Sequence, residues 1–120
     1  MALIIEITQQ TDPNVPILHL VGKFLEEDIK HFRNEIQVFL DDKTIAGIVL
    51  DYSDLQYIDS SGVGTMISIY HQLSRRGARL ALFGLNKDLL EMFEMVLMLD
   101  KILAIFSTEQ DAINYIATGK

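Results

Sequence analysis

The chain has 120 residues, 49% of them hydrophobic and 22% charged, an ordinary balance for one globular domain. Its 17 acidic and 10 basic residues give a formal net charge of −7, which argues against nucleic acid or an anionic membrane as the main partner. Cysteine is absent, which excludes disulfides and cysteine-based metal or redox chemistry. The start lacks a basic targeting segment, and no apolar stretch approaches the roughly 20 residues that span a bilayer. We therefore expect one soluble, cytoplasmic domain over residues 1–120, with an ordered core over 3–116.

Taken in chain order, the sequence alternates short apolar runs with segments of helical periodicity. Turn chemistry at Thr11-Asp12-Pro13-Asn14 joins the first two runs into an expected hairpin. The expected strands are Leu3–Thr8, Val15–Val21, Ile48–Leu50, Leu80–Phe83 and Ile102–Phe106. The expected helices are Glu26–Leu40, one that starts at Asp59-Ser60-Ser61, Lys87–Met98, and one opened by a capping box with Ser107 as its N-cap.

This element order predicts an α/β fold. Strands separated by helices need crossover connections, so most of the strand pairs are expected to be parallel, with the first hairpin adding an antiparallel edge. The fold class is therefore a single-domain mixed sheet of about five strands with about four helices. In open α/β sheets, functional sites gather at the carboxyl ends of strands. The strand at 48–50 ends at Asp51, shortly before the Asp59-Ser60-Ser61 turn.

The stretch Gly47–Gly64, GIVLDYSDLQYIDSSGVG, is the centre of the functional argument. We read it as a buried strand that ends at Asp51, a polar connection, and a helix whose first turn carries Ser60. Such a turn has unpaired N–H groups and a partial positive charge, so a phosphate on a serine there would be stabilised. An ordinary N-cap is the simplest alternative. It leaves Gly62 and Gly64 unexplained, since each costs a helix about 1 kcal/mol, unless a phosphate or partner approaches the backbone closely.

Enzymatic chemistry at this turn has little support in the sequence. A serine nucleophile needs a base, and the three histidines, His19, His31 and His71, read as structural or surface residues. The phosphate-loop lysine is also missing. A metal-assisted phospho-aspartate built on Asp51 and Asp59, as in response regulators, stays open as a minor alternative.

Two further clusters lie in the second half of the chain. Arg75, Arg76 and Arg79 surround Gly77, the expected C′ residue of the central helix, and read first as a solvated helix end. Met92 and Met95 give the following helix a second apolar side. They fit either a core or an exposed surface for binding a protein, because methionine adapts to partners.

The run Ile48-Val49-Leu50-Asp51, followed by Asp54-Leu55 and then Ile58-Asp59-Ser60-Ser61-Gly62-Val63-Gly64, resembles the STAS domains of bacterial anti-sigma factor antagonists. The length and element order of the whole chain match that family. The resemblance implies that an anti-sigma factor, which is also an ATP-dependent serine kinase, phosphorylates Ser60, with Ser61 as the second choice. The unmodified antagonist would bind this kinase and free a sigma factor, and a serine phosphatase would restore it after phosphorylation.

The resemblance also implies that the protein is not an enzyme and needs no cofactor or metal. Asp59, Gly62 and Asp51 would support the site, and the expected partner-binding residues are Ser60, Ser61, Val63, Gly64, Met92 and Met95. One departure concerns Leu25, since many members have an aspartate three residues after the glycine that aligns with Gly22. Leu25 thus points to a divergent partner, or to a STAS interaction module of another signalling circuit that is never phosphorylated.

Overall fold

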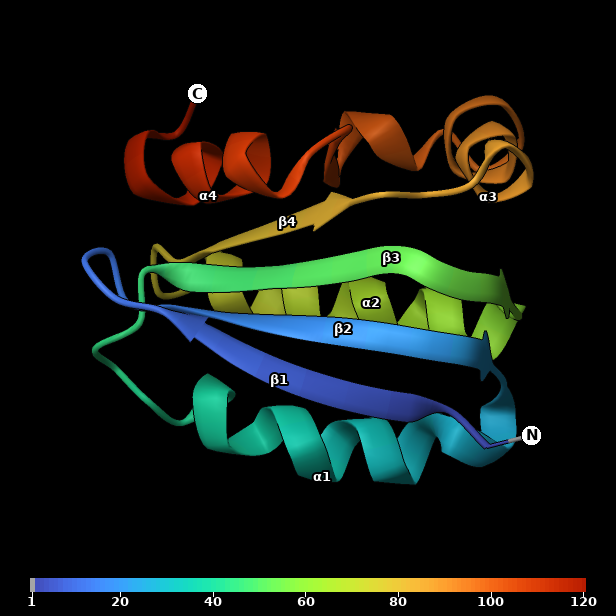
Figure 1. Ribbon diagram of the computed structural model, residues 1–120, viewed down its shortest axis with the longest axis horizontal. Coiled ribbons are helices and arrows are strands. Elements are labelled where there is room, and N and C mark those ends of the chain that lie inside the picture. Colours follow the sequence, from blue (N-terminus) through green and yellow to red (C-terminus); the bar gives the residue numbers. More distant parts are fainter. Residues whose placement is uncertain (1) are drawn as a thin grey trace.

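A computed structural model, which describes residues 2–120, contains one mixed sheet with the strand order β1-β2-β3-β4-β5 (Figure 1). The first pair is antiparallel and the remaining pairs are parallel. In chain order the strands are β1 (Ile4–Gln10), β2 (Val15–Phe24), β3 (Gly47–Ile58), β4 (Arg79–Phe83) and β5 (Ala104–Phe106). The expected fold class, with its initial hairpin, is confirmed.

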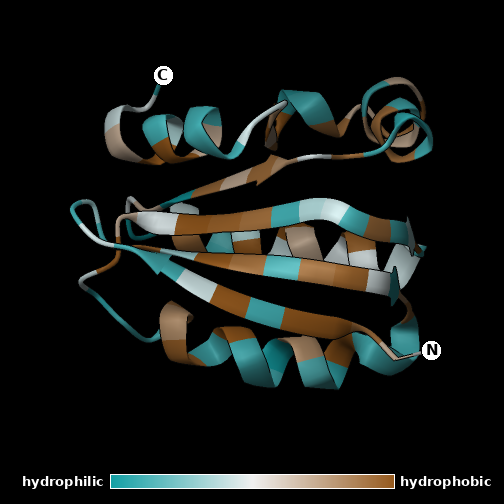
Figure 2. Ribbon diagram, viewed as in Figure 1, coloured by the Kyte–Doolittle hydropathy of each residue, from teal (hydrophilic) through white to brown (hydrophobic). Residues whose placement is uncertain are grey.

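The helices cover both faces of the sheet. In chain order they are α1 (Ile29–Leu40), which follows a 3-10 turn at Glu26–Asp28, α2 (Ser60–Ser74), α3 (Lys87–Glu91) and α4 (Glu109–Thr118). Helices α1 to α3 share the larger core cluster with one face, while α4 packs on the other face over a smaller cluster. Figure 2 shows the hydrophobic colouring concentrated in the strands between these layers. No helix within residues 2–120 combines the length and the apolar character needed to cross a bilayer.

β3 differs from the sequence-based expectation. The prediction that this strand ends at Asp51 is wrong, because β3 continues without a break to Ile58. Its second half pairs with β2 as far as Phe24 opposite Ile58, whereas its pairing with β4 stops at Asp51. Tyr52 and Leu55 are buried along this second half. The polar residues between them face solvent, so the segment is a half-buried strand and not a loop.

The helix expected over Lys87–Met98 is also interrupted. α3 ends at Glu91, and Met92–Val96 forms a wider π-helical turn in which the Leu97 N–H bonds to the Met92 carbonyl at 2.9 Å. Met98 then adopts a left-handed conformation with φ 53°. Phe93 is fully buried within this turn, which fixes the segment to the core while the chain around it changes direction.

Two expected helix ends have different outcomes. Gly77 is confirmed as the left-handed C′ residue of α2, with φ 78°, the Gly77 N–H bonded to the Ser74 carbonyl, and the following N–H bonded to the Leu73 carbonyl. The N-cap expected at Ser107 is wrong by one residue. Thr108 caps α4 instead, and its Oγ1 accepts a hydrogen bond from the Asp111 N–H at 3.1 Å.

Candidate functional site

Ser60 is the first residue of α2, at the carboxyl end of β3. Asp59 precedes it in an extended conformation and serves as the N-cap. The predicted helix start at Asp59-Ser60-Ser61 is therefore confirmed. Ser60 is exposed and Ser61 is half-buried. The side-chain hydrogen bonds found around this turn within residues 2–120 involve Asp59 and Thr65 and not the Ser60 hydroxyl, so its oxygen is available at the positive end of α2.

The Asp59 carboxylate holds the backbone on both sides of this serine. Oδ1 accepts a hydrogen bond from the Gly62 N–H and Oδ2 accepts one from the Glu26 N–H, both at 2.9 Å. The Asp59 N–H donates to the Phe24 carbonyl at 3.0 Å. Asp59 thereby ties the end of β2, the 3-10 turn and the first turn of α2 together. It positions Ser60 through the backbone, not by a hydrogen bond to the hydroxyl.

The two glycines of the first turns have different surroundings. A Cβ on Gly62 would lie 2.6 Å from Ile58 Cγ1 and 3.2 Å from Phe24 Cδ1. Gly62 is therefore required by internal packing, which lets α2 approach the ends of β2 and β3. Gly64 has open space where a Cβ would lie. Only Gly64 remains a candidate for the close approach of a partner.

Val63 and Leu25 complete the surroundings of Ser60. Val63 is only 7% exposed, so its side chain belongs to the core and offers little to a partner. Leu25 is half-buried, and its N–H donates to Asp28 Oδ2 at 2.9 Å. The other oxygen of the buried Asp28 accepts from the Leu3 N–H at 3.0 Å. The sequence reasoning missed this role of Asp28, although an acid three residues after Leu25 has the spacing of a capping box.

Asp51 lies far from Ser60 along the sheet. Asp51 and Asp59 are eight positions apart, with seven residues of β3 between them, which corresponds to about 26 Å at roughly 3.3 Å per residue. Asp51 Oδ2 lies 2.6 Å from His19 Nδ1, and Oδ1 accepts from the Ser53 N–H at 2.8 Å. The structure therefore does not bring Asp51 to the Ser60 site. It also separates the two carboxylates on which the phospho-aspartate alternative depends, and within residues 2–120 no group of three His, Cys, Asp or Glu could hold a metal ion.

The two methionines assigned to partner binding lie in different environments. Met92 is half-buried and packs against the larger core cluster, whereas Met95 is 77% exposed. The three residues after Met95 are also exposed and apolar. We call this surface the α3 patch; it comprises Met95, Val96, Leu97 and Met98.

Comparisons with known proteins place this chain in a family. A family model described as the STAS domain matches residues 6–112. An anti-sigma F factor antagonist of Paenibacillus polymyxa is 25% identical over 109 residues, which cover 91% of this chain and 92% of that protein. An anti-sigma-B factor antagonist of Listeria monocytogenes is 39% identical over 51 residues, or 41% of this chain. That match spans 45% of the Listeria protein, less than half its length.

Solved structures share the fold over nearly the whole chain. An anti-sigma factor antagonist from Mycobacterium paratuberculosis superposes with a TM-score of 0.82 at 16% identity, covering 97% of this chain and 95% of the other. The Bacillus protein SpoIIAA superposes in its phosphorylated form with a TM-score of 0.68 at 19% identity, covering 96% and 99%. The corresponding TM-score for unphosphorylated SpoIIAA is 0.73, at 18% identity and with the same coverage. Because the STAS family model matches residues 6–112, which is most of the sequence, the chain belongs to the STAS domain family.

Proposed function

We propose that this protein is an anti-sigma factor antagonist switched by phosphorylation of Ser60. Its unmodified form binds an anti-sigma factor that is also a serine kinase, and this binding releases a sigma factor. The phosphorylated form does not bind, and a serine phosphatase restores it. The protein acts in the cytoplasm as a single STAS domain, by binding and not by catalysis.

One observation carries the proposal: the Ser60 hydroxyl is exposed and without a hydrogen-bond partner in the described chain, at the N-terminus of α2. A kinase can reach this oxygen without unfolding the domain. The names of the relatives support the same role, since all four of the relatives described above are anti-sigma factor antagonists and one of them, SpoIIAA, occurs in a phosphorylated form.

The phosphoryl transfer is a substitution at phosphorus. Ser60 Oγ forms a new P–O bond to the γ-phosphorus of ATP, the bond to the leaving ADP breaks, and the hydroxyl proton passes to a base. Both oxygens of Asp59 already accept backbone N–H groups. The base is therefore assigned to the kinase, and Asp59 keeps the acceptor serine in place.

The phosphate is expected to preserve the fold. It adds about −1.5 to −2 charges at a helix N-terminus, where the backbone N–H groups and the helix dipole stabilise it. Discrimination between the two forms then arises at the interface. One like-charge contact at about 4 Å is worth roughly 1 to 4 kcal/mol between bulk water and an effective dielectric constant near 20. One or two such contacts lower the affinity about a hundredfold.

The partner surface extends beyond the serine. Ser61 and Gly64 lie on the same first turns of α2, and Leu25 adds a half-exposed apolar side chain where many family members have an aspartate. The α3 patch offers further apolar contact area. We assign these residues to the same partner interface and attribute divergent partner choice to Leu25.

Phosphorylation of the intact protein by candidate anti-sigma factor kinases with ATP tests this function. Intact mass should rise by one phosphoryl group, and Ser60→Ala should abolish the increase. Ser61→Ala serves as the matched control and should retain it. The modification should survive acid and neutral hydroxylamine, as phosphoserine does. An adduct that is lost in acid or on treatment with neutral hydroxylamine would favour the phospho-aspartate alternative, and a lack of any adduct with a kinase that binds the protein would favour the unphosphorylated module.

A further inference from the structure

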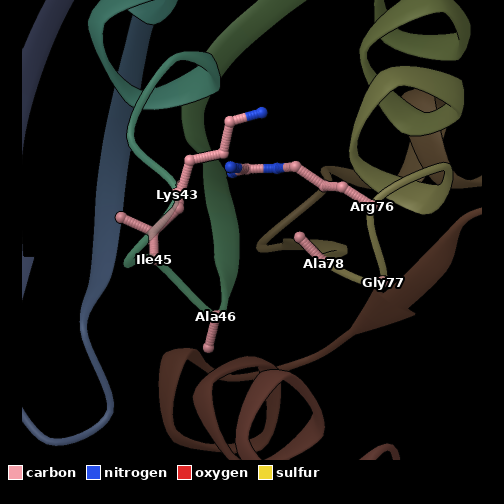
Figure 3. Close-up of a pocket in the computed structure, with 6 residues that line it drawn as sticks. All are labelled: Lys43, Ile45, Ala46, Arg76, Gly77 and Ala78. Carbon is pink, nitrogen blue, oxygen red and sulfur yellow. The ribbon is translucent and has the colours of Figure 1, made fainter.

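A cavity of about 140 Å³ lies at the amino-terminal edge of the sheet, between the segment that leads into β3 and the turn that joins α2 to β4 (Figure 3). It is at the end of α2 opposite to Ser60, about 20 Å away at 1.5 Å per helical residue. Its lining residues are Lys43, Ile45, Ala46, Arg76, Gly77 and Ala78.

The charged groups in this cavity are both positive. Lys43 and Arg76 extend from facing segments toward the same space (Figure 3), and none of the lining residues is acidic. Arg76 Nη1 donates to the Asp42 carbonyl at 2.8 Å. Its Nη2 is buried and has no hydrogen-bond partner within residues 2–120. A buried donor on a charged group left without an acceptor is destabilising, so an acceptor at this position would be favoured.

The neighbouring charged residues do not fill this role. Arg79 belongs to another contact, since its Nη1 donates to the Ile116 carbonyl at 3.0 Å. Arg75 is exposed at the end of α2 and does not line the cavity. Asp42 Oδ1 accepts from the Thr44 N–H at 2.9 Å and from its hydroxyl at 2.7 Å. These hydrogen bonds and, to a smaller extent, the nearby charge of Arg76 lower the pKa of the Asp42 carboxyl, but no hydrogen bond joins this carboxylate to Arg76 within residues 2–120. Arg76 is therefore the arginine of the sequence cluster that lines this cavity and has an unpaired guanidinium nitrogen within residues 2–120.

We propose that this cavity binds a phosphate-type oxyanion, held between the Arg76 guanidinium and the Lys43 ammonium. The N–H donors along one edge of a guanidinium are spaced to bind two oxygens of such an oxyanion. A doubly charged anion also interacts favourably with both cations. The cavity volume is ample, since a cavity of only about 10–15 Å³ can hold one water molecule. The nearby C-termini of α1 and α2 carry partial negative charge and the protein is acidic overall, so both cations are required. The anion is either free phosphate or the phosphoryl group of a small organic phosphate.

Titration of the ¹⁵N-labelled protein, with ionic strength held constant by potassium chloride, tests this site. Inorganic phosphate and glycerol 3-phosphate are the two probes. Saturable shifts are expected for the backbone amides of residues 45–46 and 76–78, separate from any shifts near Ser60. Tighter binding of glycerol 3-phosphate would identify an organic phosphate as the ligand, and equal or weaker binding would identify free phosphate.

Three variants decide the assignment. Arg76→Gln should weaken binding at least tenfold and Lys43→Ala several-fold, whereas Arg75→Ala, the adjacent arginine outside the cavity, should leave it unchanged. Lys43 is exposed in a loop, so its variant stays informative if loss of the Arg76 bond to Asp42 disturbs folding. The proposal is overturned if shifts at these amides do not saturate, or if Lys43→Ala and Arg75→Ala bind phosphate equally well.

Discussion

His19 and Asp51 form a close pair across the parallel strands β2 and β3, with His19 Nδ1 2.6 Å from Asp51 Oδ2. The other ring nitrogen of His19 lies 2.9 Å from Thr8 Oγ1, so the contact continues to β1. His19 alternates along β2 with Leu18 and Leu20, whose side chains belong to the larger core cluster, so it lies on the face opposite to α2. Figure 1 shows β1 and β2 with no helix in front of them on the face opposite to α2. Polar side chains therefore link three strands where no helix covers them.

This pair predicts a pH dependence of stability. Partial burial raises the pKa of Asp51, but hydrogen bonds from Ser53 and His19 outweigh that effect and hold the pKa below its usual value. Because the pKa is lower in the folded state, the stabilisation is complete above the unfolded value of about 3.9 and is lost as the pH falls through the folded value. Asp51→Asn should lower the free energy of unfolding by about 1–3 kcal/mol at pH 7.

Urea unfolding from pH 7 down to pH 3 measures this effect. The difference between the wild type and Asp51→Asn should shrink below about pH 4. Asp54→Asn, an exposed residue of the same strand, is the control and should show a much smaller difference at neutral pH. A difference for Asp51→Asn that stays constant down to pH 3 would contradict the assignment.

Asp59 is expected to contribute through its two backbone hydrogen bonds. Asp59→Ala removes the N-cap of α2 and the acceptor for the Glu26 N–H, and should destabilise the protein by about 2 kcal/mol. Asp59→Asn keeps one carbonyl oxygen and should have an intermediate effect. Hydrogen exchange at the Gly62 and Glu26 amides should accelerate in the same order. Unchanged exchange at Glu26 in Asp59→Ala would argue against the link between the two helical turns.

Gly62 and Gly64 form a matched pair for helix packing. Gly62→Ala introduces a methyl group within 2.6 Å of Ile58, and its overpacking cost of about 1–3 kcal/mol should exceed the gain in helix propensity. Gly64→Ala meets open space and should stabilise the protein by up to about 1 kcal/mol. Thermal and urea unfolding of both variants should thus give opposite signs. The packing role assigned to Gly62 fails if both alanines stabilise.

The charge at position 60 should control partner affinity. Ser60→Ala should bind the anti-sigma factor as tightly as the unmodified protein, and Ser60→Asp should bind about a hundredfold more weakly because like charges meet at the interface. Ser74→Asp places the same charge at the opposite end of α2 and should leave binding unchanged. Isothermal titration calorimetry with the cognate anti-sigma factor measures all three, and equal affinities for Ser60→Asp and Ser74→Asp would exclude the switch.

The α3 patch should contribute to the same complex. Met95 is 77% exposed, so Met95→Asp should weaken partner binding at least tenfold with little loss of stability. Val38→Asp changes an apolar residue of α1 that is 63% exposed and serves as the control. If both substitutions leave the affinity unaltered, the patch lies outside the interface.

The sequence anticipated the elements whose signals are local. Continuous apolar runs indicated the sheet strands, and the Asp59-Ser60-Ser61 signal located the start of α2 correctly. The sequence-based prediction failed for the second half of β3, because the polar residues on its solvent side are of the kind that is common in loops. The partner strand β2 lies more than 30 residues earlier, so no local pattern could reveal that pairing. The π-helical turn at Met92–Val96 was also missed. Its shape depends on the burial of Phe93 in the core, which is a tertiary contact that no local pattern reveals.

The amino-acid sequence alone determined the α/β class, the hairpin and the place of Ser60 at a helix start, because backbone propensity, capping and hydrophobic periodicity act over a few residues. Only the tertiary structure decided which side chains meet. It brought Asp51 to His19, Asp59 to the Glu26 N–H, and Lys43 to the cavity of Arg76. Each of these contacts joins residues about 30 positions apart, and their distance depends on strand register and helix packing, which are properties of the assembled core.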